Sequence, residues 1–481
     1  MSNLSELLPA GGAAKEFEAV ASGTLSNGQA VILNADGTVE AISETPVPAS
    51  VGSAVVFESA ACEFKRSTFD SLNNKVVVVY ADAGNSSYGT AVVGTVSGTS
   101  ISFGTPVVFF SSDTNEIAAT FDSTNNKVVI AYSDGTNANY GKAIVGTVSG
   151  TSISFGSVAA PHNGPTYSTA ATFDSTNNKV VIAYRDSSST ENGTAVVGTV
   201  SGTSISFGSP TVFETGEAYA MSATFDSTSN QVVIAYLDSV VPEGKAVVGT
   251  VSGTSISFGT AAVFNGNTQN ISATYDSNSN KTVIAFRDRT NSEKGTAIVG
   301  TVSGTSISFG TKAVFESAYS DYISAIFNST DNNVIIAYKD GGNSGYGTAI
   351  VGTVSGTSIS FDTPIITEAA NTYEMTAAYD SNSNKAAIAY NDDGNSNYGT
   401  SVVYTPPTFS TNSDSFIGIT TEAIANTATG LVTPQGGVNT SVSSLTTGTD
   451  YYVQDDGSLS TTVSSVPAGR ALSTTSILLE G

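Results

Sequence analysis

One ten-residue phrase recurs through the middle of the chain and restricts its fold more than any other feature. GTVSGTSISF occurs six times, at intervals of 51 or 52 residues, beginning at Gly94, Gly146, Gly198, Gly249, Gly300 and Gly352. An aromatic residue followed by Asp or Asn recurs seven times at similar spacing, ending at Asp70, Asp122, Asp174, Asp226, Asp276, Asn328 and Asp380. The chain therefore contains seven units, and the last of them lacks the phrase.

Each unit is predicted to form four short strands. Small and apolar residues alternate before the aromatic-Asp pair, and sequences such as DSTNNK then supply a tight turn. The second strand, for example KVVIAY from Lys127 to Tyr132, is almost continuously apolar, which in a short run between turns indicates burial on both faces. TAVVGTV forms the third strand, and Ser-Gly turns the chain into TSISF as the fourth. Units of roughly 40 to 50 residues with four strands each are typical of β-propeller blades.

The two ends of the repeated region indicate that it closes on itself. After Tyr404 the seventh unit breaks at Thr405-Pro406-Pro407 and has no fourth strand. Before the first unit, the segment from Val51 to Glu58 matches the end of a fourth strand. We therefore expect an all-β fold with a seven-bladed β-propeller over residues 50–407, closed by the N-terminal strand so that no sheet edge stays open. A linear solenoid is the alternative, but it needs a distinct capping repeat at each end.

The segments on either side of the repeats are predicted to form one small β-domain. Residues 15–49 contain two strands around Asn27-Gly28, and residues 408–481 contain strand-like runs such as Phe416 to Ile419. Neither segment holds enough apolar residues for a core of its own, and closure of the repeats brings their ends together. Residues 1–14 carry three Leu and then a Gly/Ala hinge, and form either a frayed terminus or an arm that docks on a partner.

Composition excludes several classes of function. The 17 Lys and Arg against 41 Asp and Glu give a net charge of −24, and the five Arg are scattered, so we expect no nucleic-acid partner. No apolar run approaches the ~20 residues of a membrane span, and the first residues lack a secretion signal, so we expect no membrane insertion. One Cys cannot close an intrachain disulfide, and one His leaves few metal ligands or nucleophiles. The sequence therefore predicts no catalytic residue, no metal and no cofactor.

The flanking segments resemble those of a known group of proteins. The opening SELLPAGG…ASGTLSNGQAVILNADGTVEAI and the closing FIGITTEAI…GGVNTSVSSLTTGTDYYVQDDGSLSTT…VPAGRALSTTSILL are similar to flanks of structural proteins of marine tailed bacteriophages. The repeat FDSTNNKVVIAYRD…GTAVVGTVSGTSISFG resembles repeats in the fibre and knob-like proteins of those viruses. This resemblance covers nearly the whole chain and carries no catalytic motif. It implies a virion protein, made in the host cytoplasm, whose split domain attaches to capsid or tail proteins while the propeller projects outward.

Differences between the units predict where a ligand would bind. The turns DSTNNK and VSGTS are nearly the same in each unit and lie at one edge of the blades, whereas the second-to-third loops and the links between blades differ and lie at the other edge. These variable segments are rich in Tyr, Asn, Ser and Gly, a composition suited to sugars or protein surfaces. Free drift of unconstrained loops, with the Tyr-Gly positions packed structurally, is the alternative interpretation. The candidate ligand-binding residues are Tyr88, Tyr140, Tyr167, Arg185, Tyr219, Arg287, Tyr319, Tyr322, Lys339 and Tyr373.

Three patterns resemble catalytic or metal sites but depart from them. Aromatic-x-Asp, which first ends at Asp82, resembles the Asp-box of sialidase-like propellers, yet its spacing differs, so these Asp residues are expected to cap turns. The three cations Arg185, Arg287 and Lys339 stand at matching strand ends but do not make up the convergent Arg, Tyr nucleophile and acid that a sialidase needs. The segments 276–280 and 380–384 match the opening of a calcium loop but lack its Gly and its distal Glu, so plain hairpin turns are expected.

The repeats, the flanks and the variable loops together predict two functions from different classes. The first is a virion structural protein that decorates capsid or tail as a fibre or knob. The second is a receptor- or glycan-binding module that uses the variable edge to attach to a host-surface glycan or protein. A glycan hydrolase is third, because no catalytic constellation is present. The chain has no coiled-coil heptads, so the sequence leaves a homo-oligomer open without direct support.

Overall fold

The computed structural model describes residues 15–188 and 190–480. These residues form β-strands and three short 3-10 turns, η2 (Ala83–Asn85), η3 (Asp393–Asn395) and η4 (Ser413–Ser415), and contain no α-helix, which confirms the all-β prediction. Accordingly, none of these residues belongs to a helix long and apolar enough to cross a membrane. The chain divides into two compact parts, a repeat region (Ala49–Pro406) and a flanking domain made of the chain up to Pro48 and from Pro407 onward. The predicted N-terminal arm, residues 1–14, lies outside the described residues.

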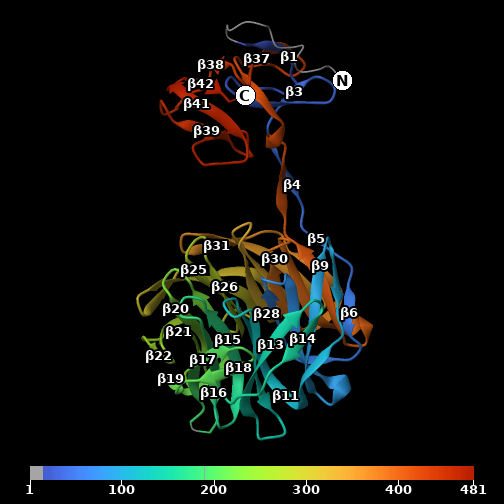
Figure 1. The fold of residues 1–481 in the computed structure, drawn as a ribbon, viewed down its shortest axis with the longest axis vertical. Helices are drawn as coiled ribbons and strands as arrows, with labels where there is room; N and C mark the ends of the chain where they lie inside the picture. Colours follow the sequence, from blue (N-terminus) through green and yellow to red (C-terminus); the bar gives the residue numbers. More distant parts are fainter. Residues whose placement is uncertain (1–14, 189, 481) are drawn as a thin grey trace. The chain divides into compact units, whose positions relative to one another are not determined.

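Each repeat folds into antiparallel strands that pair in chain order (Figure 1). In repeat 1, β7 (Cys62–Asp70) pairs with β8 (Lys75–Asp82), β8 pairs with β9 (Tyr88–Ser97), and β9 pairs with β10 (Ser100–Phe103). Every residue of β8 after Lys75 is buried, because neighbouring repeats cover both faces of this strand. The continuous apolar pattern of the second strands has this cause.

The other repeats use the same four positions. First strands are β15 (Thr166–Asp174), β24 (Thr268–Asp276) and the later parts of β11 (Val107–Asp122), β19 (Thr211–Asp226), β28 (Ala313–Asn328) and β32 (Ile365–Asp380). Second strands are β12 (Lys127–Asp134), β16 (Lys179–Asp186), β20 (Gln231–Asp238), β25 (Lys281–Asp288), β29 (Asn333–Asp340) and β33 (Lys385–Asp392). Third strands are β13 (Tyr140–Ser149), β17 (Asn192–Ser201), β21 (Glu243–Ser252), β26 (Lys294–Ser303), β30 (Tyr346–Ser355) and β34 (Tyr398–Thr405). Fourth strands are β14 (Ser152–Phe155), β18 (Ser204–Phe207), β22 (Ser255–Phe258), β23 (Ala262–Asn265), β27 (Ser306–Phe309) and β31 (Ser358–Phe361).

Four long strands run from one repeat into the next. The first part of β11 lies beside β9 at the outer edge of repeat 1, and its last part is the first strand of repeat 2, beside β12. The strands β19, β28 and β32 make the same passage between later repeats. At these four places the predicted link between repeats is therefore continuous strand.

The last repeat takes its outer strand from the other end of the repeat region. The strands β5 (Ser50–Val51) and β6 (Val55–Glu58) both pair with β34, with Val51 opposite Tyr404 and Val56 opposite Thr400. In Figure 1 the blue β6 accordingly lies beside the orange strands of repeat 7. Residues before the first repeat thus occupy the place of the fourth strand that repeat 7 lacks.

Apolar cores and side-chain hydrogen bonds join neighbouring repeats. Val78 and Tyr80 of repeat 1 share a buried cluster with Ala387 and Ala389 of repeat 7, and similar clusters join the consecutive repeats. The first strands are also bonded to one another: the Ser324 hydroxyl accepts the Ala377 amide at 3.0 Å between repeats 6 and 7.

The same kind of bond crosses from repeat 7 to repeat 1. There the Thr376 hydroxyl accepts the Ser67 amide at 3.0 Å. The contact between the last and first repeats therefore reproduces the contacts between consecutive repeats.

A glycine after each SISF phrase lets two repeats approach closely. A Cβ at Gly208 of repeat 3 would overlap the carbonyl oxygen of Thr254 in repeat 4, and the glycines that end the other SISF phrases meet the equivalent Thr, except after repeat 6. Gly52, in the strand pair that completes repeat 7, meets Thr99 of repeat 1 in the same way. Repeat 7 has no SGT turn, and at this position repeat 6 carries Asp362 instead of Gly. The glycine is therefore required by the neighbouring backbone.

The flanking domain draws on both ends of the chain. One sheet has the order β1 (Phe17–Val20), β37 (Thr429–Pro434), β36 (Phe416–Thr420), β2 (Ala30–Leu33) and β3 (Val39–Ala41). A second has the order β38 (Val438–Asn439), β42 (Ser476–Leu479), β41 (Pro467–Ser473), β39 (Asp450–Val453) and β40 (Leu459–Ser460), and β4 (Glu44–Val47) pairs with β35 (Thr408–Thr411). Ile32 and Ile42 share one buried core with Phe416, Val453 and Leu479, so both ends of the chain contribute to the same core.

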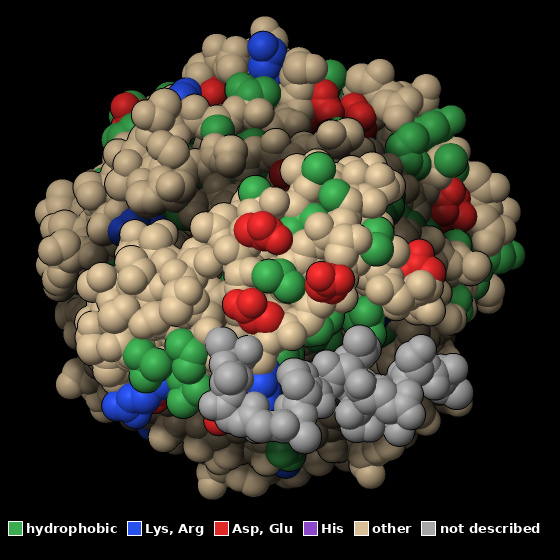
Figure 2. Space-filling model, turned by 90° about the horizontal axis from the view of Figure 1, so that it is seen from above, with side chains coloured by type: hydrophobic (Ala, Val, Ile, Leu, Met, Phe, Trp, Pro, Cys, Tyr) green, Lys and Arg blue, Asp and Glu red, His purple; other side chains and the backbone are tan. Residues whose placement is uncertain are grey.

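Uncharged groups dominate the face shown in Figure 2. Charged side chains cover a small part of it, the acidic ones outnumber the basic ones, and no basic stripe crosses this face. This agrees with a chain in which 12% of the residues are charged. On such a protein, several cations gathered at one place are a distinctive feature.

The close approach of the repeats gives a first prediction. Replacing Gly208 by Ala should lower the free energy of unfolding by roughly 1–3 kcal/mol, because the methyl group would displace the backbone of the next repeat. Asp362→Ala is the matched control, since this position already carries a Cβ. Urea unfolding of both variants, followed by circular dichroism, tests the prediction. Equal destabilisation by the two changes would contradict it.

Candidate functional site

The repeat region has two different edges. The first-to-second turns and the third-to-fourth hairpins lie at one edge, here called the turn edge. The second-to-third loops and the passages between repeats lie at the opposite edge, here called the variable edge. Ser50 pairs with Thr405 at the turn edge, so both ends of the repeat region leave it there. The variable edge is free of these connections.

The Asp residues that recur in the repeats accept hydrogen bonds within the turns that they begin. Asp122 accepts the backbone amides of Thr124 and Asn125 at 3.1 and 2.9 Å. In the aromatic-x-Asp motif of repeats 1 to 6, the Asp carboxylate accepts the amide two residues later. These bonds confirm the predicted capping role for those six residues. The seventh, Asp392, makes no such bond.

The segments that resembled calcium loops are ordinary turns. Asp276 accepts the amides of Asn278 and Ser279 with one oxygen and the Ser279 hydroxyl with the other. Both carboxylate oxygens therefore already serve the hairpin. Within the described ranges, no group of three or more His, Cys, Asp or Glu side chains is placed to hold a metal ion.

The first strands of all seven repeats line one central cavity of about 450 Å³. Each of these strands carries a β-bulge near the variable edge. The bulged residue has a positive φ between 47° and 53° in each case, and these residues are Phe64, Glu116, Ser168, Ala220, Asn270, Tyr322 and Glu374. Apart from Asn, such residues seldom adopt this conformation. The bulges place seven side chains of six kinds around the mouth of the cavity.

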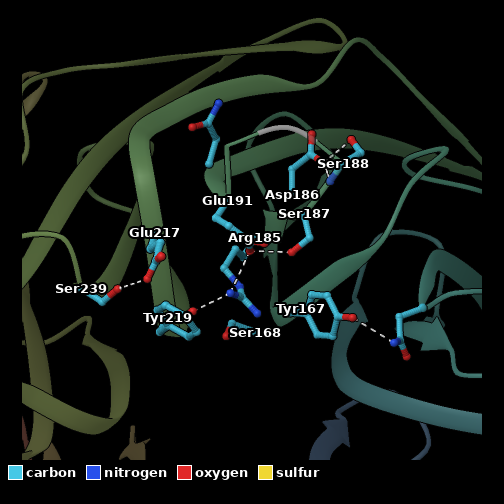
Figure 3. A network of polar contacts seen from close by, with 12 residues as sticks. Tyr167, Ser168, Arg185, Asp186, Ser187, Ser188, Glu191, Glu217, Tyr219 and Ser239 are labelled. Atoms are coloured by element: carbon cyan, nitrogen blue, oxygen red, sulfur yellow. Dashed lines mark hydrogen bonds and ion pairs between the residues drawn. The ribbon is translucent and has the colours of Figure 1, made fainter.

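Arg185 is held between two tyrosines at this mouth. The residue before each bulge pairs with the second strand, which sets Tyr167 opposite Arg185. The guanidinium lies 4.9 Å from the ring centroid of Tyr167 and 4.1 Å from that of Tyr219. It donates to the Tyr219 hydroxyl at 2.6 Å and pairs with Glu191 at 2.8 Å (Figure 3). Arg185 therefore joins side chains of repeats 3 and 4.

Arg287 and Lys339 make comparable stacks in the next repeats. The Arg287 guanidinium lies 4.9 Å from the ring centroid of Tyr319 and pairs with Asp321 at 3.2 Å. The Lys339 ammonium lies 4.0 Å from the ring centroid of Tyr373. Burial lowers the pKa of Lys339 below its usual value. Three cation-aromatic stacks thus lie at one end of the repeat region.

A groove of about 620 Å³ opens beside the central cavity. Tyr219, Leu237 and Arg287 line it, and it shares Ala220, Asn270 and Tyr322 with the cavity. Burial raises the pKa of Tyr322 to about 12, so the phenol stays protonated and can donate a hydrogen bond at neutral pH.

The candidate residues named from the sequence separate into two groups. The structure joins eight of them in cation-aromatic or aromatic contacts near the variable edge, namely Tyr167, Arg185, Tyr219, Arg287, Tyr319, Tyr322, Lys339 and Tyr373. Of these eight, Tyr322 lines the cavity, and Tyr219, Tyr322 and Arg287 line the groove. Tyr88 and Tyr140 begin third strands and line neither the cavity nor the groove.

Three charged residues that line the cavity, Arg66, Glu116 and Glu374, and one buried beside it, Lys65, were not among those candidates. Lys65 and Arg66 lie on β7, Glu116 on β11 and Glu374 on β32. Aligning the seven units position by position would have revealed the first two, because the other units carry only uncharged residues at both positions. The two Glu stand at a position that holds six kinds of residue in seven units, so no pattern distinguishes them.

Lys65 is fully buried where repeats 7 and 1 meet. Its ammonium donates to the Cys62 carbonyl at 2.6 Å and to the Asn391 side-chain oxygen at 2.7 Å. Cys62 and Asn391 also bond each other twice, at 3.1 and 3.0 Å. Burial lowers the pKa of Lys65 to about 8. The lysine therefore adds a costly charge to a pair of residues that satisfy each other.

Comparison with known proteins shows the fold. No family model matches the chain, and no curated protein matches it significantly. The BP39L lectin of Burkholderia pseudomallei aligns over 73% of this chain and 98% of its own, with 11% identity and a TM-score of 0.54. A protein of unknown function from Dyadobacter fermentans aligns over 74% and 99%, with 12% identity and a TM-score of 0.47. A leech intramolecular trans-sialidase aligns over 76% and 70%, with 9% identity and a TM-score of 0.45. The alignment with the BP39L lectin shows that the chain has a β-propeller fold.

Burial of Lys65 gives a prediction about pH. Its pKa is lower in the folded protein than its ordinary value of 10.5, so between pH 8 and 10.5 the unfolded chain binds more protons and stability rises with pH. Lys65→Met places there the residue of repeats 4 and 7. We expect this variant to be more stable than the native protein at pH 7, by up to about 3 kcal/mol, and the difference to shrink as pH approaches 10.5. Urea unfolding at several pH values measures it, and a constant difference between the two proteins would contradict the prediction.

Proposed function

We propose that the chain is an attachment protein of a phage particle. In this proposal the repeat region is a seven-bladed β-propeller closed by β5 and β6, the flanking domain anchors it to capsid or tail proteins, and the variable edge binds a host-surface glycan. The observation that carries the binding function is the set of cation-aromatic stacks around one mouth. Of the five Arg in the chain, Arg185 and Arg287 stack on tyrosines there, and Arg66 lines the cavity.

The contacts across the last and first repeats support the closed ring. β34 pairs with β5 and β6, Thr376 bonds Ser67, and Gly52 meets Thr99, each as at the other junctions. A linear solenoid would leave the outer side of β34 unpaired. Its first repeat would also expose the buried faces of Val78 and Tyr80.

The chemistry of the mouth suits a glycan. Tyr rings offer flat apolar faces for sugar C–H groups and phenol hydroxyls for hydrogen bonds, and they lose little entropy on binding. The shared cavity and groove have the size of small-ligand sites. That a protein with the same fold is a lectin supports this choice of ligand.

The same geometry favours binding over catalysis. A glycosidase needs an acid and a nucleophile or base facing one bond. Arg185 and Arg287 are each paired with a carboxylate, Glu191 and Asp321, so they do not act as free cations toward a substrate. Two further glutamates, Glu116 and Glu374, line the cavity, but Arg66 lies on the strand between theirs, and we interpret the three as a set of hydrogen-bonding groups. We therefore do not assign a hydrolytic reaction, although a trans-sialidase is among the similar structures.

Attachment to a particle rests on the resemblance of the flanks to phage structural proteins. The position of the two chain ends is compatible with it, because they leave the repeat region at the turn edge and keep the variable edge free. In a cryo-EM map of the intact particle, we expect the flanking domain to contact a capsid or tail protein. A particle without density for the chain would contradict this part of the proposal.

Glycan binding is tested with the mouth tyrosines. We expect a quadruple variant in which Tyr167, Tyr219, Tyr319 and Tyr373 become Asn to lose at least tenfold in affinity for the glycans that the native protein binds on an array, because the apolar platforms are removed. Asn occurs at the corresponding places in other repeats, as Asn115 and Asn371, so the fold should tolerate it.

The control is the double variant Tyr88→Asn and Tyr140→Asn, which copies Asn192 of repeat 3 at the same strand position. It should bind as the native protein does. An array on which the quadruple variant binds normally would contradict the proposal, as would one on which the native protein binds no glycan.

A further inference from the structure

One wall of the central cavity carries three charged side chains on three neighbouring strands. No other group of neighbouring repeats has this combination at the same positions. Arg66 lies on the first strand of repeat 1, between Glu374 on that of repeat 7 and Glu116 on that of repeat 2. All three line the cavity. The opposite wall is formed at the same level by Ser168, Ala220 and Asn270. The cavity therefore has one charged side and one uncharged side of smaller residues.

Arg66 stands where the fold requires only a small residue. The corresponding positions of repeats 2 to 7 hold Ala118, Ala170, Ser222, Ser272, Ser324 and Thr376. In repeats 4 to 7 this hydroxyl bonds the next first strand, for example Ser222 to the Ala273 amide at 2.9 Å. Repeats 2 and 3 do without the bond because their residue is Ala. Packing between repeats therefore does not explain why repeat 1 carries an arginine at this position.

The guanidinium of Arg66 has free donors. One nitrogen donates to the Lys65 carbonyl at 2.7 Å, and an arginine carries five N–H donors. Arg66 is exposed to the cavity and forms no ion pair with any carboxylate in residues 15–188 or 190–480. This distinguishes it from Arg185 and Arg287, whose charges are paired.

The two glutamates have free acceptors on either side of Arg66. Glu116 accepts the Ser168 amide at 2.7 Å with one oxygen, which leaves its second oxygen open. Glu374 is half-buried and makes no side-chain hydrogen bond in the part of the chain that the structure describes. Burial raises the pKa of Glu116 while the nearby Arg66 lowers it. The wall thus presents an acceptor, a donor and an acceptor in sequence around the cavity.

This order of groups suits a ligand that carries several hydroxyls, such as a sugar ring. A sugar hydroxyl can donate to a carboxylate and at the same time accept from a guanidinium, and both bonds are strengthened by charge. Phe64 and Tyr322 border the same wall and offer apolar surface to the ring. An acidic sugar would place its carboxylate near two glutamates and only one free cation, which is unfavourable.

We propose that the central cavity is a single binding site for the terminal neutral hexose of a glycan, with its hydroxyls bound by Glu374, Arg66 and Glu116. This inference rests on the proposed glycan-binding function and adds to it the class of sugar and the place where the sugar binds. Because the three charged residues occur together only once, the chain binds one such hexose despite having seven repeats. The tyrosine stacks of the mouth then contact the sugars that follow.

Calorimetric titration with small sugars tests this site without the rest of a glycan. The probes are methyl glycosides of mannose, glucose and galactose, with methyl glucuronide as the acidic counterpart. We expect at least one neutral hexoside to bind with one site per chain, and the glucuronide to bind at least tenfold more weakly. Failure of all three hexosides to bind would overturn the inference, and so would several sites per chain or a preference for the glucuronide.

The variants for this test copy residues that other repeats carry at the same positions. Arg66→Ala introduces the residue of repeats 2 and 3, and Glu374→Ala introduces that of repeat 4, Ala220, which has the same backbone conformation. Each should weaken hexoside binding at least tenfold without changing the urea unfolding midpoint by more than Lys142→Thr does. The latter removes a cation outside the cavity, copies Thr90 of repeat 1, and should bind as the native protein.

The two proposals fail in different ways. Normal hexoside binding by Arg66→Ala would overturn the cavity site, while tyrosine-dependent binding on the array would still support the proposed function. An array without any bound glycan would contradict the proposed function even if the isolated hexoside occupied the cavity.

Discussion

The pairing of β34 with β5 and β6 is the interaction on which the rest of the repeat region depends. Without it, the third strand of repeat 7 would expose its backbone donors and acceptors, and the apolar faces of repeats 7 and 1 would lie open to water. The same pairing brings residues 50 and 405 together at the turn edge. Both connections to the flanking domain therefore leave from one side, and the variable edge carries none of the constraints that keep the turns alike.

Much of this organisation follows from the sequence because it repeats. The second strands are apolar throughout since both faces are covered, and their predicted burial agrees with strands such as β8. The Asp residues of the turns were assigned from local chemistry alone, and local hydrogen bonds hold six of the seven aromatic-x-Asp residues. The bulges could not be assigned in this way. A residue such as Glu116 or Tyr322 with φ near 50° follows no propensity, because the paired second strand and not the residue imposes this backbone.

Residues that differ from those at the same position in the other repeats do so for two distinct reasons. The contacts that each residue makes show which reason applies. Asp362 replaces a glycine because repeat 7 offers no SGT turn to meet, and Lys65 donates to partners that are found only where repeats 7 and 1 adjoin. Both departures are explained by the incomplete seventh repeat and by its contact with repeat 1. Arg66 is next to Lys65 in the sequence, yet within residues 15–188 and 190–480 its side chain donates one hydrogen bond, to the neighbouring carbonyl, and its other donors have no partner. Because Arg66 makes no contact that the junction of the repeats requires, ligand binding is the explanation that we propose for it.

The bulged first strands explain how a repetitive scaffold can hold one asymmetric site. In a regular strand, alternate side chains point toward the two neighbouring repeats, where close packing accepts only small or apolar residues. The left-handed residue of each bulge interrupts this alternation at the level of the cavity mouth. At this position the repeats carry residues as different as Ala220 and Glu116. Substitution at these positions changes the lining of the cavity, and the contacts that the bulged residues make with the next repeat, such as that of Glu116 with the Ser168 amide, are not common to all seven repeats. Conserved packing and variable recognition are thereby assigned to different residues of the same strand.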